Sequence, residues 1–358
     1  MHVLAGLGGA ALILAMLGEF FVAFMLPRRV KRDPRLARGI YAALWRPWRA
    51  AAALLSPEAE DTVLGFFGPL ALLVELAVWV LGIMFGFALL QWAFGSDLGP
   101  GTHHFGDDIY FSSGEFLSAA AGGAPVGTTA KALSLAEAAT GVGVLFIVIG
   151  YLPSIYFGFS RREIAVSQLG TRAGTPPTAV HLLRRISEGG RWDDLRAYLA
   201  AAEEWVAELM ETHLSYPLLA YYRSQHVNQN WLAALTTIVD TSAAVLAAIP
   251  EGRAAVAEQT YAIGRHALSD LAHVFRVRPG EVQRLTDDAF DALWRALEPW
   301  ERASLDRETM RRRLDDLRGA YEPNAIGLSV ALALALPGWA PGEGRTRAPR
   351  LPSRRRGG

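Results

Sequence analysis

The sequence predicts an all-α membrane protein with three transmembrane helices, a short re-entrant helix and loop between the second and third, and a cytoplasmic α-helical bundle. Half of the 358 residues are hydrophobic (51%), and the formal net charge is zero. The apolar residues gather in three segments, each with the roughly 20 residues that cross about 30 Å of hydrocarbon. A later region of mixed charge has apolar residues at helical spacing and few strand signals.

The first apolar segment, residues 1–26, is interrupted only by Glu19. A cleaved signal peptide would need a basic start and a small-residue cleavage site, and the segment has neither before Arg28 and Arg29. We therefore expect a retained transmembrane helix, with a cleaved signal as the alternative.

Residues 27–61 are expected to form a basic loop before the second apolar segment, residues 62–94, which contains Glu75. The segment that follows, up to the third apolar segment, has Lys131 as its single Lys or Arg. The positive-inside rule then places the basic loop in the cytoplasm and the N-terminus outside. This predicts a multi-pass protein of the cell inner (plasma) membrane whose C-terminal domain is cytoplasmic. The cations of the loop are Arg28, Arg29, Lys31, Arg32, Arg35, Arg38, Arg46 and Arg49.

The third apolar segment, residues 133–159, follows a stretch rich in Gly and Ala between 118 and 129. Non-helical backbone survives at membrane depth only where protein buries it or where it lines a water-filled cavity. We therefore expect a re-entrant segment inside an assembly with a polar interior. The alternative is an extracellular loop with a small amphipathic helix.

Several short motifs carry a resemblance to a known family. They are Ile109-Tyr110-Phe111-Ser112, Thr128 to Leu133, Glu137 to Gly143, Ile149 to Pro153, and Arg172 to Ala179. Together they resemble the pore domain of bacterial two-transmembrane potassium channels, which gives the region 62–159 an outer helix, a pore helix, a filter turn and an inner helix. The resemblance implies a homotetramer that transports monovalent cations across the bilayer. It also implies a gate that bends at Gly141, Gly143 or Gly150 beside Pro153.

At the position of the family's filter the chain departs from the pattern. A potassium filter replaces the ion's hydration shell with backbone carbonyls. Its glycines adopt conformations that cost other residues about 1–2 kcal/mol each, so four copies of Ala120 would cost about 4–8 kcal/mol. We expect a weakly selective cation pore, with a non-conducting, channel-derived scaffold or sensor as the alternative. The filter residues are Ser118, Ala119, Ala120, Ala121, Gly122 and Gly123.

Glu137 lies near the start of the inner helix, behind the expected filter. A hydrogen bond to the pore helix or the turn would make it a structural carboxylate, and ion coordination is the alternative. Glu19 and Glu75 are expected to pair with other spans or to extend their carboxylates toward the interface. Intramembrane carboxylates of this kind are costly and often functional.

The region 160–322 is expected to form about six cytoplasmic helices, with breaks at residues 175–177, 249–252 and 278–280, where prolines and glycines gather. Residues 323–358 combine an apolar run, too short to span and expected to pack on the bundle or the membrane surface, with a disordered basic tail.

The sequence has no phosphate-binding glycine loop, no nucleophile elbow and no cysteine. We expect no enzymatic activity, no cofactor and no nucleic-acid partner. The polar and aromatic run 213–226 is open to a ligand-binding or vestibule role. Its two histidines, His213 and His226, lack a second ligand pair and are expected to be structural rather than metal ligands.

Overall fold

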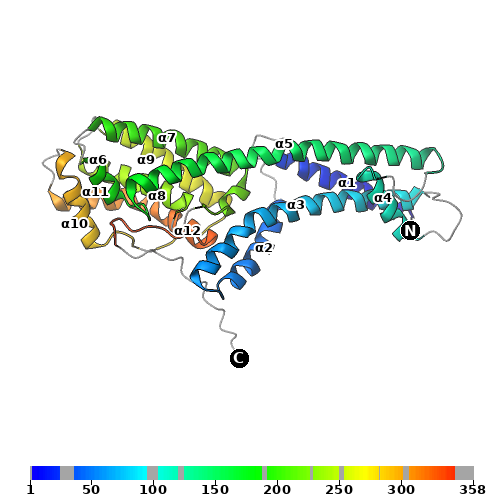
Figure 1. Ribbon diagram of the computed structural model, residues 1–358, viewed down its shortest axis with the longest axis horizontal. Coiled ribbons are helices and arrows are strands. Elements are labelled where there is room, and N and C mark those ends of the chain that lie inside the picture. The colour runs from blue at the N-terminus through cyan, green and yellow to red at the C-terminus, as the bar shows by residue number, and fades with distance from the viewer. Residues whose placement is uncertain are drawn as a thin grey trace, which may run out of the picture. The chain divides into compact units, whose positions relative to one another are not determined.

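The computed structural model describes residues 2–24, 36–94, 104–119, 125–187, 192–225, 229–249, 254–281, 283–300 and 306–342 (Figure 1). These residues form helices and no β-strand. The chain divides into two compact units, Met1–Tyr156 (unit 1) and Phe157–Gly358 (unit 2).

In unit 1, helices α1 (His2–Phe24) and α3 (Pro57–Phe94) pack antiparallel at very close range. A Cβ atom placed on Gly9 would lie 2.6 Å from the carbonyl oxygen of Gly86, so the two backbones touch there. Small residues at such crossings are a usual device of membrane helices. A cluster that includes Ile13, Trp79 and Phe87 fills the rest of this interface.

The basic segment expected as a loop contains a helix, α2 (Leu36–Ala52), which lies along the N-terminal part of α3 (Figure 1). The ring of Trp45 packs on Phe67 at 4.8 Å, and Trp48 donates through Nε1 to the carbonyl of Val63. Aromatic residues on one side of an otherwise Arg-rich segment therefore bind α2 to α3.

The two carboxylates at 19 and 75 both bind α2. Glu19 accepts a hydrogen bond from the backbone N–H of Leu36 at the start of that helix, at 3.1 Å. Glu75, which is 4% exposed, accepts one from the hydroxyl of Tyr41. Glu19 thus satisfies a free N–H of the first turn, where a negative charge is also favourable.

Two more helices, α4 and α5, follow α3 in the chain. Helix α4 (Phe105–Phe116) is short and packs on α3, whereas α5 (Thr128–Ala173) runs for 46 residues without a break, through Pro153 and past the boundary between the units.

Four helices are long and apolar enough to span a membrane by length and composition, namely α1, α3, α5 and α8 (Trp231–Ala248). Of these, α1, α3 and α5 correspond to the three apolar segments expected from the sequence. Almost every residue of α8 is buried inside unit 2. By contrast, the large hydrophobic side chains that are exposed among the described residues all lie between Val3 and Ile164. The apolar outer surface suited to lipid is therefore carried by α1, α3, α4 and α5, as expected of a membrane protein.

Unit 2 is a helical bundle around α8. Six α-helices, α6 to α11, are described between residues 160 and 321, where about six were expected, and α12 follows them. The predicted breaks at 175–177 and 278–280 fall between helices, whereas most of the one at 249–252 lies outside the described residues. The apolar run 325–336 packs within the bundle, because Ile326, Leu328 and Leu336 are buried. The tail from 343 lies outside the described residues. The elements are α6 (Ala179–Ser187), α7 (Trp192–Ser215), η1 (Pro217–Tyr221), α8, α9 (Ala255–Val274), α10 (Asp287–Ala296), η2 (Glu298–Trp300), α11 (Arg307–Gly319) and α12 (Glu322–Leu332).

Candidate functional site

The expected filter begins directly after α4. Ser118 has φ +54°, and Ala119 donates its N–H to the carbonyl of Gly114 at 2.8 Å. This left-handed residue with a bond back across the last turn is the usual way to end a helix, and it fixes how the chain leaves α4. Ala120, Ala121, Gly122 and Gly123 lie outside the described residues, so the carbonyl geometry of the filter stays a prediction.

Glu137 on α5 is completely buried and accepts a hydrogen bond from Ser112 of α4. This is the contact to the short helix that was expected from the sequence. The same serine oxygen lies 2.8 Å from the carbonyl of Met84 on α3. The hydroxyl group of Ser112 thus has two acceptors within hydrogen-bond distance of its single proton, the Glu137 carboxyl group and the Met84 carbonyl.

A second serine–carboxylate pair lies along the same two helices. Ser134 of α5 donates to Glu115 of α4. We call the four residues Ser112, Glu115, Ser134 and Glu137 the polar seam. Because Ser134 and Glu137 are three residues apart on α5, and Ser112 and Glu115 three apart on α4, each helix presents both groups on one face.

The glycines expected at the gate have different surroundings. A Cβ atom on Gly141 would lie 2.0 Å from the carbonyl oxygen of Phe116, so α5 touches the end of α4 there. Gly143 and Gly150 have open space where a Cβ would stand, and Pro153 lies inside the unbroken helix α5. Gly141 therefore has a packing role that sequence alone did not indicate, and the bending of α5 stays a prediction.

Gln91 on α3 is a further buried polar group that the sequence analysis did not single out. It is 1% exposed, and neither atom of its amide group has a hydrogen-bond partner among the described residues. Its only sequence signal was a polar residue near the end of an apolar segment.

In unit 2, His213 is buried between a cation and an aromatic ring. Its Nδ1 lies 2.9 Å from the carbonyl oxygen of Leu209, its Nε2 lies 3.4 Å from Arg162, and its ring lies 4.8 Å from that of Trp231. Burial, with the charge of Arg162 in addition, lowers the pKa of His213 to about 3. The ring is therefore neutral, donating from Nδ1 and accepting at Nε2. This is a structural role; His226 lies outside the described residues, which contain no cluster of three metal-ligating side chains.

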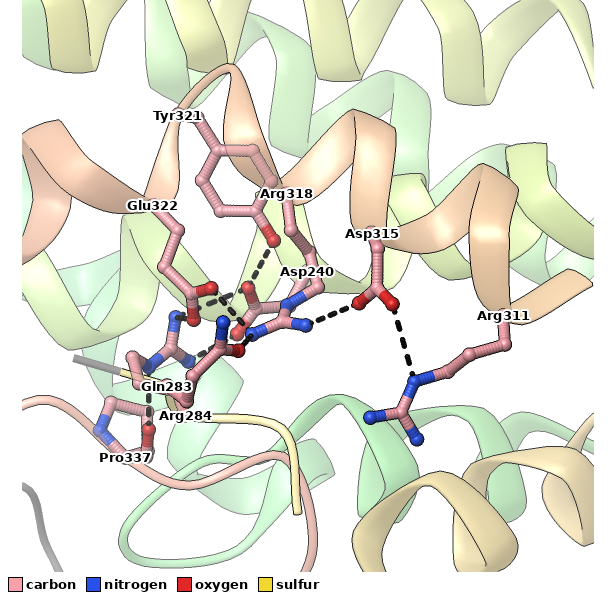
Figure 2. Close-up of polar contacts among 9 residues, drawn as sticks. All are labelled: Asp240, Gln283, Arg284, Arg311, Asp315, Arg318, Tyr321, Glu322 and Pro337. Carbon is pink, nitrogen blue, oxygen red and sulfur yellow. Dashed lines mark hydrogen bonds and ion pairs between the residues drawn. The ribbon is translucent and has the colours of Figure 1, made fainter. Parts of the chain in front are cut away.

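The core of unit 2 contains an ionic network (Figure 2). Arg284 contacts Asp240 of α8 through two nitrogens, at 2.5 and 3.3 Å, and Glu322 of α12 at 3.2 Å. Arg318 of α11 contacts the other oxygen of Glu322 at 2.7 Å. Two cations and two anions thus neutralise one another where water is excluded.

Two further groups complete the network. Tyr321 donates its hydroxyl to Asp240, and burial together with that negative charge raises the pKa of Tyr321 well above its ordinary value. Burial alone would lower the pKa of Arg284, but Asp240 and Glu322 outweigh it and raise that pKa. Figure 2 shows the chain of contacts continuing from Arg318 through Asp315 to Arg311, which is partly exposed.

An open cleft of about 440 Å³ between α6 and α10 is lined by Arg184 and Arg295, with Ser187, Ala292, Ala296 and Pro299. Both arginines lie in the last turn of their helices. Positive charges there are favoured by the helix dipole, which accounts for them without a ligand.

Comparison of the chain with protein-family models, with curated proteins and with solved structures found no match. The resemblance to potassium channels therefore depends on the motifs of the sequence alone. A function for the polar seam has to be inferred from the chemistry of its residues.

Proposed function

We propose that this protein is an ion-channel-like membrane protein that passes monovalent cations across the inner membrane. In this proposal four copies surround one axis, the segment Ser118 to Gly123 forms the narrow part of the path, and the bundle of unit 2 regulates it from the cytoplasm. The proposal includes no enzymatic step and no cofactor.

The polar seam is the observation that carries the proposal. Carboxylates in membrane segments are costly and normally face a protein interior or a water-filled cavity. Glu115 and Glu137 lie between a short helix and a long apolar one, each bonded to a serine of the other helix. This arrangement braces α4 at a fixed place against α5, which is what a short helix beside an ion path requires.

The direction of α4 supports the same proposal. Its C-terminal end immediately precedes Ser118, and its last turn has no basic residue. The C-terminus of a helix carries a partial negative charge, which favours a nearby cation. A cation held by the segment after α4 would therefore be stabilised by the helix without a side-chain ligand.

The second candidate is a non-conducting scaffold or sensor. Ala120 and Ala121 stand where the resembled family has a filter glycine and an aromatic residue, which opposes selective conduction. Unit 2 has an extensive hydrophobic core of its own, so it offers a stable surface for a partner even without ion flow.

Reconstitution of the purified protein in planar bilayers separates the two candidates. We expect cation currents, and a detergent-solubilised particle whose protein mass is that of four chains of 38.8 kDa. Glu137→Gln should reduce the current, whereas Glu58→Gln, at the exposed start of α3, serves as the control. A tetramer without current would favour the scaffold, and a particle of one or two chains would contradict the channel.

A further inference from the structure

Two neighbouring arginines on α5 have opposite surroundings. The side chain of Arg161 is 71% exposed and pairs with Glu208, whereas that of Arg162 is 1% exposed. Both follow the third apolar segment, residues 133–159, by two or three residues. A buried arginine is expensive unless its donors are satisfied, so the contacts of Arg162 indicate what this residue does.

The guanidinium group of Arg162 binds two backbone carbonyls in the turn that follows α7. Its NH1 donates to the carbonyl of Leu219 at 2.8 Å, and its NH2 donates to the carbonyl of Tyr222 at 2.9 Å. Leu219 lies in the middle of η1 and Tyr222 directly follows it, so one side chain holds this short element at two points. The planar fork of arginine suits two acceptors at once, which a lysine cannot reproduce.

Two side chains hold the fork in place. Glu163 accepts from Nε at 2.9 Å and also from the hydroxyl of Ser224 at 3.1 Å. His213 presents its neutral Nε2 at 3.4 Å from NH1. We call Arg162, Glu163 and His213, with the carbonyls of Leu219 and Tyr222, the Arg162 clamp.

Apolar side chains also pack α5 against the same turn. A Cβ atom on Gly158, one helical turn before Arg162, would lie 3.2 Å from Leu219, so the helix passes close to η1. The ring of Phe159 lies 5.7 Å from that of Tyr222 and 5.0 Å from the guanidinium carbon of Arg162. The joint is therefore fixed by packing as well as by hydrogen bonds.

We propose that the Arg162 clamp is the joint through which the helical bundle sets the position of α5. Helix α5 continues without a break from Arg162 into its apolar half, so we expect a shift of η1 and α7 to be passed along this helix. The clamp consequently couples a signal received by the bundle to the ion path. This inference rests on the proposed function for its physiological meaning, but the joint itself can be tested without ion flow.

The first test measures the joint with spin labels. The chain has no cysteine, so labels can be placed at Ile164→Cys on α5 and Glu211→Cys on α7, both exposed, in full-length protein diluted with unlabelled chains. Arg162→Met and Arg162→Lys should broaden the distribution of distances between the labels, because neither side chain can hold both carbonyls. Arg161→Met is the matched control and should leave it narrow. A narrow distribution in folded Arg162→Met, or in Arg162→Lys if the methionine variant does not fold, would overturn the clamp.

The second test asks whether a change at the Arg162 clamp reaches the apolar half of α5. A single label at Leu152→Cys lies 10 residues before Arg162 on the same helix, at a position that is 42% exposed. We expect it to become more mobile in the Arg162 variants and to stay unchanged in Arg161→Met. If the labels around the joint respond and the label at 152 does not, the clamp is local packing and the inference is wrong.

Bilayer recording connects the joint to the proposed function. Arg162→Lys should change the open probability by about 2- to 30-fold, with the single-channel conductance unchanged. An unchanged open probability together with a mobile label at 152 would refute control through the clamp. If the wild-type protein carries no current, the channel proposal fails, while the label measurements still decide the joint.

Discussion

Arg284 and Asp240 form a two-pronged ion pair at the centre of unit 2, with side chains that are 0% and 1% exposed. The pair joins α8 to the segment before α10. Because Nε of Arg284 also donates to the carbonyl of Pro337 at 3.2 Å, the same guanidinium group holds the C-terminal part of the bundle.

Arg284→Met is expected to destabilise unit 2 by about 3–5 kcal/mol, because it leaves Asp240 and Glu322 buried with one cation fewer. Chemical denaturation followed by circular dichroism measures this. Arg196→Met, which breaks an exposed pair with Asp193 at 3.8 Å, should cost less than about 1 kcal/mol. An equal loss of unfolding free energy in the two variants would show that the buried network contributes no more to stability than an exposed ion pair.

The neutral His213 predicts a pH dependence of stability. Its pKa is about 3 in the folded protein, against about 6.5 in an unfolded chain. As the pH falls, the unfolded state therefore binds the proton before the folded state does. The stabilisation that the neutral His213 contributes is complete above about pH 6.5 and is lost as the pH falls toward 3. The expected slope is about 1.4 kcal/mol per pH unit.

The slope is best measured between about pH 5 and 6.5, above the range where most carboxyl groups titrate. His213→Gln removes the titrating group and should flatten the curve of unfolding free energy in that window. His266→Gln, at an exposed histidine on α9, is the control. A slope that survives in His213→Gln would assign the effect to another group.

Sequence predicted those features of this chain that depend on local pattern. The apolar spans, the short helix between the second and third of them, and the breaks at prolines follow from periodicity and turn chemistry within about 20 residues. A bond between Glu137 and the short helix was expected because a carboxylate in an apolar segment needs a partner. Helix α2 was missed because its arginines were read only as topology signals, although Trp45 and Trp48 indicated one apolar face.

Features that depend on distant partners were not predictable in this way. Arg162 binds carbonyls 57 and 60 residues away, and Asp240 binds Arg284 44 residues away. Nothing in the sequence around Arg162 or Arg284 indicates that these arginines are buried, whereas Arg161 is exposed. Helix α8 also reaches the hydropathy of a membrane span, and its enclosure by protein sets it apart most clearly from α1, α3 and α5.

Gly141 and Gly143 offer a matched pair for testing the contact between α4 and α5. Gly141→Ala forces a Cβ atom against the backbone of Phe116 and is expected to cost about 1–3 kcal/mol by overpacking. Gly143→Ala has open space and should stabilise the helix by about 0.5–1 kcal/mol. Thermal stability in detergent compares them, and a harmless Gly141→Ala would mean that α4 does not lie where the structure places it.

The segment 333–340, which we call the C-terminal strap, is held by side chains of the bundle. Arg223 donates to the carbonyl of Ala333, and Asn230 donates to that of Ala335. Trp339 is completely buried. Trp339→Ala should therefore cost about 3–5 kcal/mol. Deletion of residues 343–358 is the control and should leave the unfolding free energy unchanged, so an equal loss in both would contradict a specific role of the strap.

Selectivity is the most direct test of the residues after α4. If Ala120 and Ala121 prevent a ladder of carbonyls, currents should discriminate poorly between potassium and sodium. Ala120→Gly combined with Ala121→Tyr should then raise the preference for potassium, because glycine removes the Cβ strain and the ring restores packing around the turn. Reversal potentials under mixed-ion conditions measure the preference. A wild-type protein that already selects potassium strongly would show that carbonyls of other residues form the sites.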